Sequence, residues 1–193
     1  MDFKQHISGL ILAGGRSSRM GGEDKSWMPY RGKPMIEQVL QRISPQVSCV
    51  LVSANKNIGQ YQQLGCSVIA DELPDHPGPL AGIAVALASC ETDWLLVTAC
   101  DAPNIPEDLA QRLWQGIQGC EHEVKMAYPH DGEQTQHLFM LLHRDCLASL
   151  ENALQQDQHR VMQWVNSQNS IEVDFSDQAT AFININTPLE LKS

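Results

Sequence analysis

The sequence of 193 residues lacks several features that define large classes of protein. No apolar run approaches the roughly 18 residues that span a bilayer, and the first residues carry charges instead of the apolar core of an export signal. The six cysteines lie far apart, with no Cys-x-x-Cys pair and no Cys/His cluster at zinc spacing. We therefore expect reduced thiols, mostly in the core, and a cytoplasmic protein.

Positive charge is also scarce. Thirteen Lys and Arg face 23 Asp and Glu, which gives a formal charge of -10. This balance argues against broad attraction to nucleic acid or an anionic membrane, and we expect neither as a partner. The composition, with 42% hydrophobic residues, is typical of one globular domain over residues 1–193.

The few basic residues are unevenly placed. Five of the 13 lie in residues 16–33 with only two acidic neighbours, so this window carries +3 and the remainder -13. A short cationic segment in a chain that is otherwise negatively charged favours a small anionic ligand bound at one place.

The apolar pattern alternates between strands and helices. The spacing predicts strands at 7–12, 50–52, 68–70 and 94–97, and helices from 34, over 80–88 and from Pro106. Such units in series indicate a three-layer, Rossmann-like α/β fold with a mainly parallel sheet and helices on both faces. Ligands then bind outside the carboxyl ends of the strands.

The second half is less regular. Strands are predicted at 124–128 and 138–142, on either side of a polar stretch that is either a hairpin or a loop over the site. Helices are expected near 146–154 and 160–165. Asn184 and Asn186 alternate with isoleucines, as on the polar face of a further strand.

A glycine-rich segment follows the first predicted strand and contains most of the cationic window. Gly14 and Gly15 allow backbone N–H groups to approach a phosphate, and Arg19 and Lys25 supply positive charge. The segment matches neither the Walker A loop nor G-x-G-x-x-G. A flexible surface loop is the alternative, but the combination of glycines and cations after a strand favours a phosphate cradle.

Asp101 lies where the fourth strand should end, at the same edge as the glycine segment. A carboxylate there suits Mg²⁺, which commonly takes one or two carboxylates together with substrate phosphates. The alternative role is a helix or turn cap. Asp71 ends the third predicted strand and points to the same rim.

Separated motifs in the same order resemble the molybdenum cofactor guanylyltransferases, a family of nucleotidyltransferases. They are LAGG at 12–15, RMGG at 19–22, DK at 24–25, GKP at 32–34, PGPLAG at 77–82, CDAP at 100–103, DG at 131–132 and NINTP at 184–188. The resemblance runs nearly end to end. It implies transfer of GMP from GTP to the terminal phosphate of molybdopterin or Mo-molybdopterin, which gives molybdopterin guanine dinucleotide and pyrophosphate.

The resemblance also implies roles for particular residues. Arg19, Lys25 and Asp101 would be catalytic, with Mg²⁺ on Asp101. The expected GTP contacts are Leu12, Ala13, Gly14, Gly15, Lys25, Ser53, Asp71 and Asp101, and the expected molybdopterin contacts are Asp131, Gln136, Asn184 and Asn186. The N-terminal half would bind GTP and the C-terminal half molybdopterin. Proteins that handle molybdopterin and apo-molybdoenzymes would be partners.

The sequence departs from the family pattern at two places, and two alternative functions remain open. Ser53 stands where the family often has Asn, so this contact is shorter, water-mediated or shifted to Asn55. A proline common in the family is missing around 135–138. The alternatives are a cytidylyltransferase acting on molybdopterin or on a sugar or polyol phosphate, and a carrier that binds the cofactor without catalysis.

Overall fold

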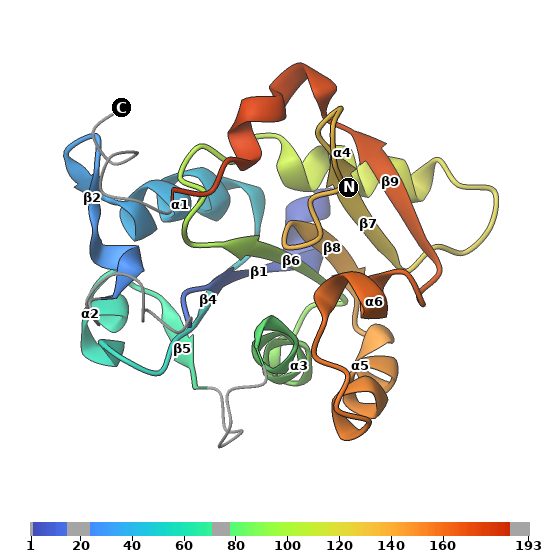
Figure 1. The fold of residues 1–193 in the computed structure, drawn as a ribbon, viewed down its shortest axis with the longest axis horizontal. Coiled ribbons are helices and arrows are strands. Elements are labelled where there is room, and N and C mark those ends of the chain that lie inside the picture. The colour runs from blue at the N-terminus through green and yellow to red at the C-terminus, as the bar shows by residue number, and fades with distance from the viewer. Residues whose placement is uncertain (1, 15–23, 71–77, 186–193) are drawn as a thin grey trace.

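A computed structural model describes residues 2–14, 24–70 and 78–185. Its centre is a seven-stranded sheet in the order β5-β4-β1-β6-β8-β7-β9 (Figure 1). Only β8 runs antiparallel to its neighbours, β6 and β7. The strands are β1 (Ile7–Leu12), β4 (Val50–Ser53), β5 (Ser67–Ile69), β6 (Trp94–Ala99), β7 (Met126–His130), β8 (Met140–His143) and β9 (Ser170–Asp174).

Helices cover both faces of this sheet, so the molecule has three layers (Figure 1). One face carries α1 (Met35–Ile43), α4 (Leu109–Gln118) and the 3-10 segment η5 (Ser176–Phe182). The other carries α3 (Pro79–Ser89), α5 (Cys146–Gln155) and α6 (Val161–Val165). The predicted three-layer α/β fold is confirmed.

The central strand β1 shows why the sheet is buried on both sides. Ile7 and Ile11 pack with the α1 and α4 layer, whereas Leu10 packs with the α3 and α5 layer, and all three are fully buried. Successive side chains of a strand point to opposite faces, so neighbouring apolar residues such as Leu10 and Ile11 supply the two cores.

Shorter elements lie at the edges and connections. They are η1 (Phe3–His6), η3 (Lys25–Trp27), β2 (Pro29–Tyr30), β3 (Lys33–Pro34), η4 (Ser44–Gln46) and α2 (Ile58–Gln63). β2 and β3 form a hairpin whose two turn residues, Arg31 and Gly32, have φ of 49° and 82°. Positive φ at both positions is the requirement of a type I′ turn.

Most predicted elements are confirmed, and two predictions are wrong. Pro106 does not start a helix: its carbonyl accepts hydrogen bonds from Leu109 N and from Gln46 Nε2, which makes a turn, and α4 begins at Leu109. A strand is also expected around 182–186, but residues 182–185, the part of this segment that the structure describes, form none. There, η5 ends at Phe182, and the backbone of Ile185 bonds to Asp101 instead of a sheet neighbour.

Two further expectations concern the state of the cysteines and the absence of an apolar segment long enough to span a membrane. All six cysteines, every one among the described residues, are free thiols, and four of them are buried. No helix within the described ranges has the length and apolar character needed to cross a membrane.

Candidate functional site

The candidate site lies at the carboxyl edge of the sheet, where β1, β4 and β6 end together. Past the end of β1, Ala13 N donates to Ser53 O at 3.0 Å, and Cys100 N donates to Leu12 O at 3.1 Å. The parallel pairing therefore continues one residue beyond the strands. It fixes the backbone leading into Gly14 between the ends of β4 and β6.

A lysine–aspartate pair occupies this edge. Lys25 Nζ lies 2.6 Å from Asp101 Oδ2, and the two side chains are 20% and 21% exposed. Lys25 comes from η3, whereas Asp101 follows β6, and the Asp101 carbonyl accepts a hydrogen bond from Ile185 N at 2.8 Å. Residues 76 positions apart thus meet in a partly exposed ion pair.

Two glycines at this edge have different reasons for lacking a side chain. A Cβ on Gly82, in the first turns of α3, would lie 2.6 Å from Ser53 Oγ, so close packing of α3 on β4 requires glycine. Among the described residues, apart from its chain neighbours, a Cβ on Gly14 would meet only Ser53 O, at an ordinary 3.6 Å. Packing against the described residues therefore does not demand glycine at 14.

Polar side chains lie beneath the pair. Ser26 Oγ donates to Cys100 Sγ at 3.4 Å, and Tyr61 Oη donates to the Asp24 carboxylate at 2.9 Å. Burial raises the pKa of the Cys100 thiol to about 12, with a contribution from the Asp101 charge. This thiol stays protonated near neutral pH, so it is unsuited to act as a nucleophile.

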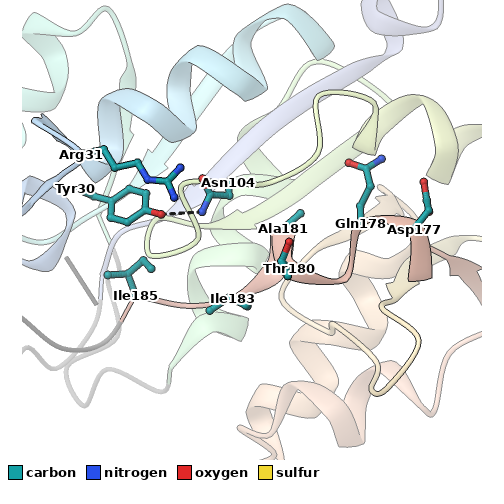
Figure 2. A pocket seen from close by; sticks show the side chains of 9 residues that line it. All are labelled: Tyr30, Arg31, Asn104, Asp177, Gln178, Thr180, Ala181, Ile183 and Ile185. Atoms are coloured by element: carbon teal, nitrogen blue, oxygen red, sulfur yellow. Dashed lines mark hydrogen bonds between the residues drawn. The ribbon is translucent and has the colours of Figure 1, made fainter. Parts of the chain in front are cut away.

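A groove with a volume of about 600 Å³ extends to Ile185, whose backbone N–H bonds to the Asp101 carbonyl. Its walls come from the β2–β3 hairpin, the segment after Asp101, and the stretch from η5 to Ile185 (Figure 2). Asn104 Nδ2 donates to Tyr30 Oη at 3.1 Å, and the Arg31 guanidinium lies 4.9 Å from the Tyr30 ring centre. Ile183, 54% exposed, offers an apolar surface to the same groove.

The structure brings Asp131 and Gln136 together. Gln136 Nε2 donates to Asp131 Oδ2 at 2.6 Å, and the backbone N–H groups of Glu133 and Gln134 donate to Asp131 Oδ1. Burial would raise the pKa of Asp131, but these hydrogen bonds outweigh it and lower the pKa. The Asp131 carboxylate therefore organises its own turn in the loop between β7 and β8.

The other predicted site residues divide into two groups. Leu12, Ala13, Gly14, Ser53, Lys25 and Asp101 lie together at the carboxyl edge, and Asn184 immediately precedes the residue bonded to Asp101. Gly15, Arg19, Asp71 and Asn186 lie outside the described residues. Within the described ranges, no group of three or more His, Cys, Asp or Glu side chains is placed to share a metal ion.

Sequence reasoning assigned no role to four residues of the site: Asp24 and Gly82, which it placed only within motifs, and Ser26 and Tyr61, which it did not single out. Asp24 and Ser26 flank Lys25, and this adjacency was the available signal. The small-residue spacing of 78–82 could have indicated Gly82. Tyr61 lies on α2, a helix with too short an apolar pattern to be predicted.

Fold and site together define a three-layer α/β protein whose candidate site lies at the carboxyl edge of its sheet, the edge at which such folds bind their ligands. The sequence matches the family described as "MobA-like NTP transferase domain" over residues 9–171. The chain belongs to this family.

One relative agrees with that assignment, and two solved structures share the fold. The chain is 42% identical over 192 residues to the molybdenum cofactor guanylyltransferase of Photobacterium profundum, covering 100% of this chain and 97% of the relative. The crystal structure of molybdopterin-guanine dinucleotide biosynthesis protein A from Archaeoglobus fulgidus superposes with a TM-score of 0.74 at 24% identity, covering 96% and 95% of the two chains. The 2-C-methyl-D-erythritol 4-phosphate cytidylyltransferase of Thermus thermophilus shares the fold at a TM-score of 0.69 and 16% identity, covering 95% and 94%.

Proposed function

We propose that this protein transfers GMP from GTP to the terminal phosphate of molybdopterin or Mo-molybdopterin, forming molybdopterin guanine dinucleotide and pyrophosphate. Family membership and relatives named molybdenum cofactor guanylyltransferase support the proposal. The observation that carries it is the Lys25–Asp101 pair at the carboxyl edge of the sheet. A cation and a hard carboxylate together suit a triphosphate and its counter-ion.

The nucleotide is assigned to the end of β1. Leu12, Ala13, Gly14 and Ser53 contribute backbone and hydroxyl groups, and Gly15 and Asp71 are assigned to the same ligand. The absence of a side chain at Gly14 supports this assignment, because phosphate groups bind backbone N–H donors where no side chain intervenes.

Nucleotidyltransferases of this kind typically use a divalent metal, and Mg²⁺ is the ion we propose. Asp101 is a partly exposed oxygen ligand next to the nucleotide end of the sheet, which fits the preference of Mg²⁺ for one or two carboxylates plus phosphates. Bound there, Mg²⁺ would supply charge neutralisation on the phosphates.

The reaction is a substitution at the α-phosphorus of GTP. An oxygen of the acceptor's terminal phosphate forms the new P–O bond, the bond from the α-phosphorus to the α,β-bridging oxygen breaks, and pyrophosphate leaves with that electron pair. Lys25 and Arg19 are assigned to the leaving phosphates, where they offset the developing negative charge. The chain otherwise positions two anions, and no covalent intermediate is required.

The acceptor is assigned to the C-terminal half of one domain spanning 1–193, with GTP in the N-terminal half. Asn184 lies one residue before the backbone bond to Asp101, which supports its assignment to the acceptor. Asn186 is assigned with it, and Asp131 and Gln136 are assigned as an already ordered pair. Proteins that handle molybdopterin and apo-molybdoenzymes are the proposed partners. A cytoplasmic location belongs to the same proposal, supported by the free thiols.

A pyrophosphate-release assay tests the proposal. Purified protein is incubated with molybdopterin, Mg²⁺ and each nucleoside triphosphate in turn. We expect release with GTP that depends on the acceptor. A preference for CTP would instead identify a cytidylyltransferase, and saturable binding with no pyrophosphate under any condition would identify a carrier.

A further inference from the structure

The segment that presents Lys25 is fixed on both sides by side-chain hydrogen bonds. On one side, Asp24 caps η3 by accepting from Ser26 N at 3.1 Å through Oδ1. Its Oδ2 accepts from Tyr61 Oη at 2.9 Å and from Asn57 Nδ2 at 3.0 Å. Asp24 thereby joins the Lys25 segment to the α2 region.

On the other side, Ser26 joins the segment to β6. Its hydroxyl donates to Cys100 Sγ at 3.4 Å, and both residues are buried. Cys100 directly precedes Asp101, so the backbones carrying both members of the ion pair are tied together beneath it. Lys25 and Asp101 meet because their neighbours are already fixed.

Tyr61 is the buried side-chain donor to Asp24, whereas the other such donor, Asn57, is exposed. The Tyr61 side chain is fully buried, and its ring lies 5.1 Å from the Trp27 ring, so the last residue of η3 also packs on it. Burial raises the pKa of the Tyr61 hydroxyl above its ordinary value, and the Asp24 charge raises it further. The hydroxyl therefore keeps its proton near neutral pH and donates to the carboxylate.

We propose that Tyr61 and Asp24 are positioning residues that hold Lys25 where it meets the triphosphate. Neither residue is assigned to the substrate; they act through the backbone and side-chain placement of Lys25. This inference rests on the proposed function, because it concerns the charge offered to the bound nucleotide. The hydrogen bond from Tyr61 to Asp24 is charge-assisted and strongly directional.

The test is a double-mutant cycle between Tyr61→Phe and Lys25→Met. Binding of Mg²⁺–GTP is measured by calorimetry, and turnover by pyrophosphate release with molybdopterin. Phe keeps the buried ring and removes only the hydroxyl. We expect Tyr61→Phe to weaken binding and lower kcat by about tenfold each, the scale of one hydrogen bond to a charged group.

The cycle separates positioning from general damage. If Tyr61 acts through Lys25, its substitution causes no further loss in the Lys25→Met background. Equal losses in both backgrounds, or a Tyr61→Phe protein that matches the wild type, would overturn the inference. Tyr128→Phe, which removes a hydroxyl from another buried tyrosine on the opposite face of the sheet, is the control and should stay within about twofold of wild type.

Folding is checked by circular dichroism and thermal unfolding of every variant. If Tyr61→Phe does not fold, Asp24→Asn enters the same cycle, since it weakens the same hydrogen bond and keeps the tyrosine. Failure of the proposed function gives a different result: wild-type protein that binds no nucleoside triphosphate or releases no pyrophosphate. If the wild type is active but the losses caused by Tyr61→Phe and Lys25→Met simply add, the positioning role is wrong and the proposed function still stands.

Discussion

Replacing Asp101 by Asn should have opposite effects on binding and on turnover. The Asp101 carboxylate lies 2.6 Å from Lys25 Nζ and neutralises it. Asn is nearly isosteric and still offers an oxygen to the ammonium group, so the substitution removes one negative charge while preserving shape. The net charge of the pair changes from zero to +1.

The magnitude follows from Coulomb's law. A phosphate bound by Lys25 would lie about 5 Å from the Asp101 carboxylate, where repulsion amounts to about 1 kcal/mol in water and about 3 kcal/mol at an effective dielectric constant of 20. Both side chains are about one-fifth exposed, which favours a value between these limits. Metal-free GTP should therefore bind about tenfold more tightly to Asp101→Asn.

Turnover should change in the other direction. Loss of a charged group that acts at the reacting phosphates typically costs about 10²- to 10³-fold in kcat. Calorimetry with GTP and EDTA measures the first effect, and pyrophosphate release in Mg²⁺ buffer measures the second. Substantial turnover by the variant, or weaker binding of metal-free GTP, would refute the reasoning.

The matched control is Asp145→Asn. Asp145 forms a similar pair with Lys125, with Nζ and Oδ2 2.7 Å apart. Lys125 directly precedes β7, so this pair lies at the edge of the sheet opposite to the candidate site. This variant changes the total charge of the protein by the same amount. It should leave both GTP binding and turnover unchanged, so a parallel change in this control would assign the effect to overall charge.

Three further predictions concern packing, pH and thiol chemistry. Gly82→Ala should lower the free energy of unfolding by about 1 to 3 kcal/mol, because the added Cβ would lie 2.6 Å from Ser53 Oγ. Denaturant titration measures this free energy, and an unchanged value would contradict the prediction. Asp131→Asn should destabilise the protein by about 1 kcal/mol at pH 7. The pKa of Asp131 is lowered from 3.8 in the folded protein. The stability difference between the wild type and Asp131→Asn should therefore be complete above pH 3.8 and should vanish as the pH falls through the folded pKa. A stability difference that stays constant between pH 7 and pH 2 would contradict this. Exposed Cys49 should react with a thiol reagent at pH 8 well before buried Cys100, as peptide mass mapping would show; equal labelling rates would contradict the assigned burial.

The part of the fold predictable from sequence is the part with continuous apolar runs. Residues 7–12 and 94–97 are apolar enough to be buried on both faces, so β1 and β6 and their shared edge could be placed in advance. That placement explains why Asp101 was expected near the glycine segment. In the structure Asp101 lies 2.6 Å from Lys25 Nζ, so these two residues meet at that edge.

The rest depended on tertiary contacts that leave little local signal. The α2 sequence, IGQYQQ, has only two large side chains with apolar surface, so its helix and the role of Tyr61 could not be predicted. β9 is half exposed and reads as polar, although pairing with β7 makes it a strand. Ile183 and Ile185 suggest a strand by their alternation, yet the chain there turns to contact Asp101.

In the proposed reaction the α-phosphate of GTP moves to the acceptor. The most direct measurement incubates the protein with molybdopterin, Mg²⁺ and GTP labelled with ³²P at either the α or the γ position. We expect the α label to become attached to the acceptor and the γ label to leave as pyrophosphate. Transfer of the γ label to the acceptor, or retention of both labels in GTP, would contradict it.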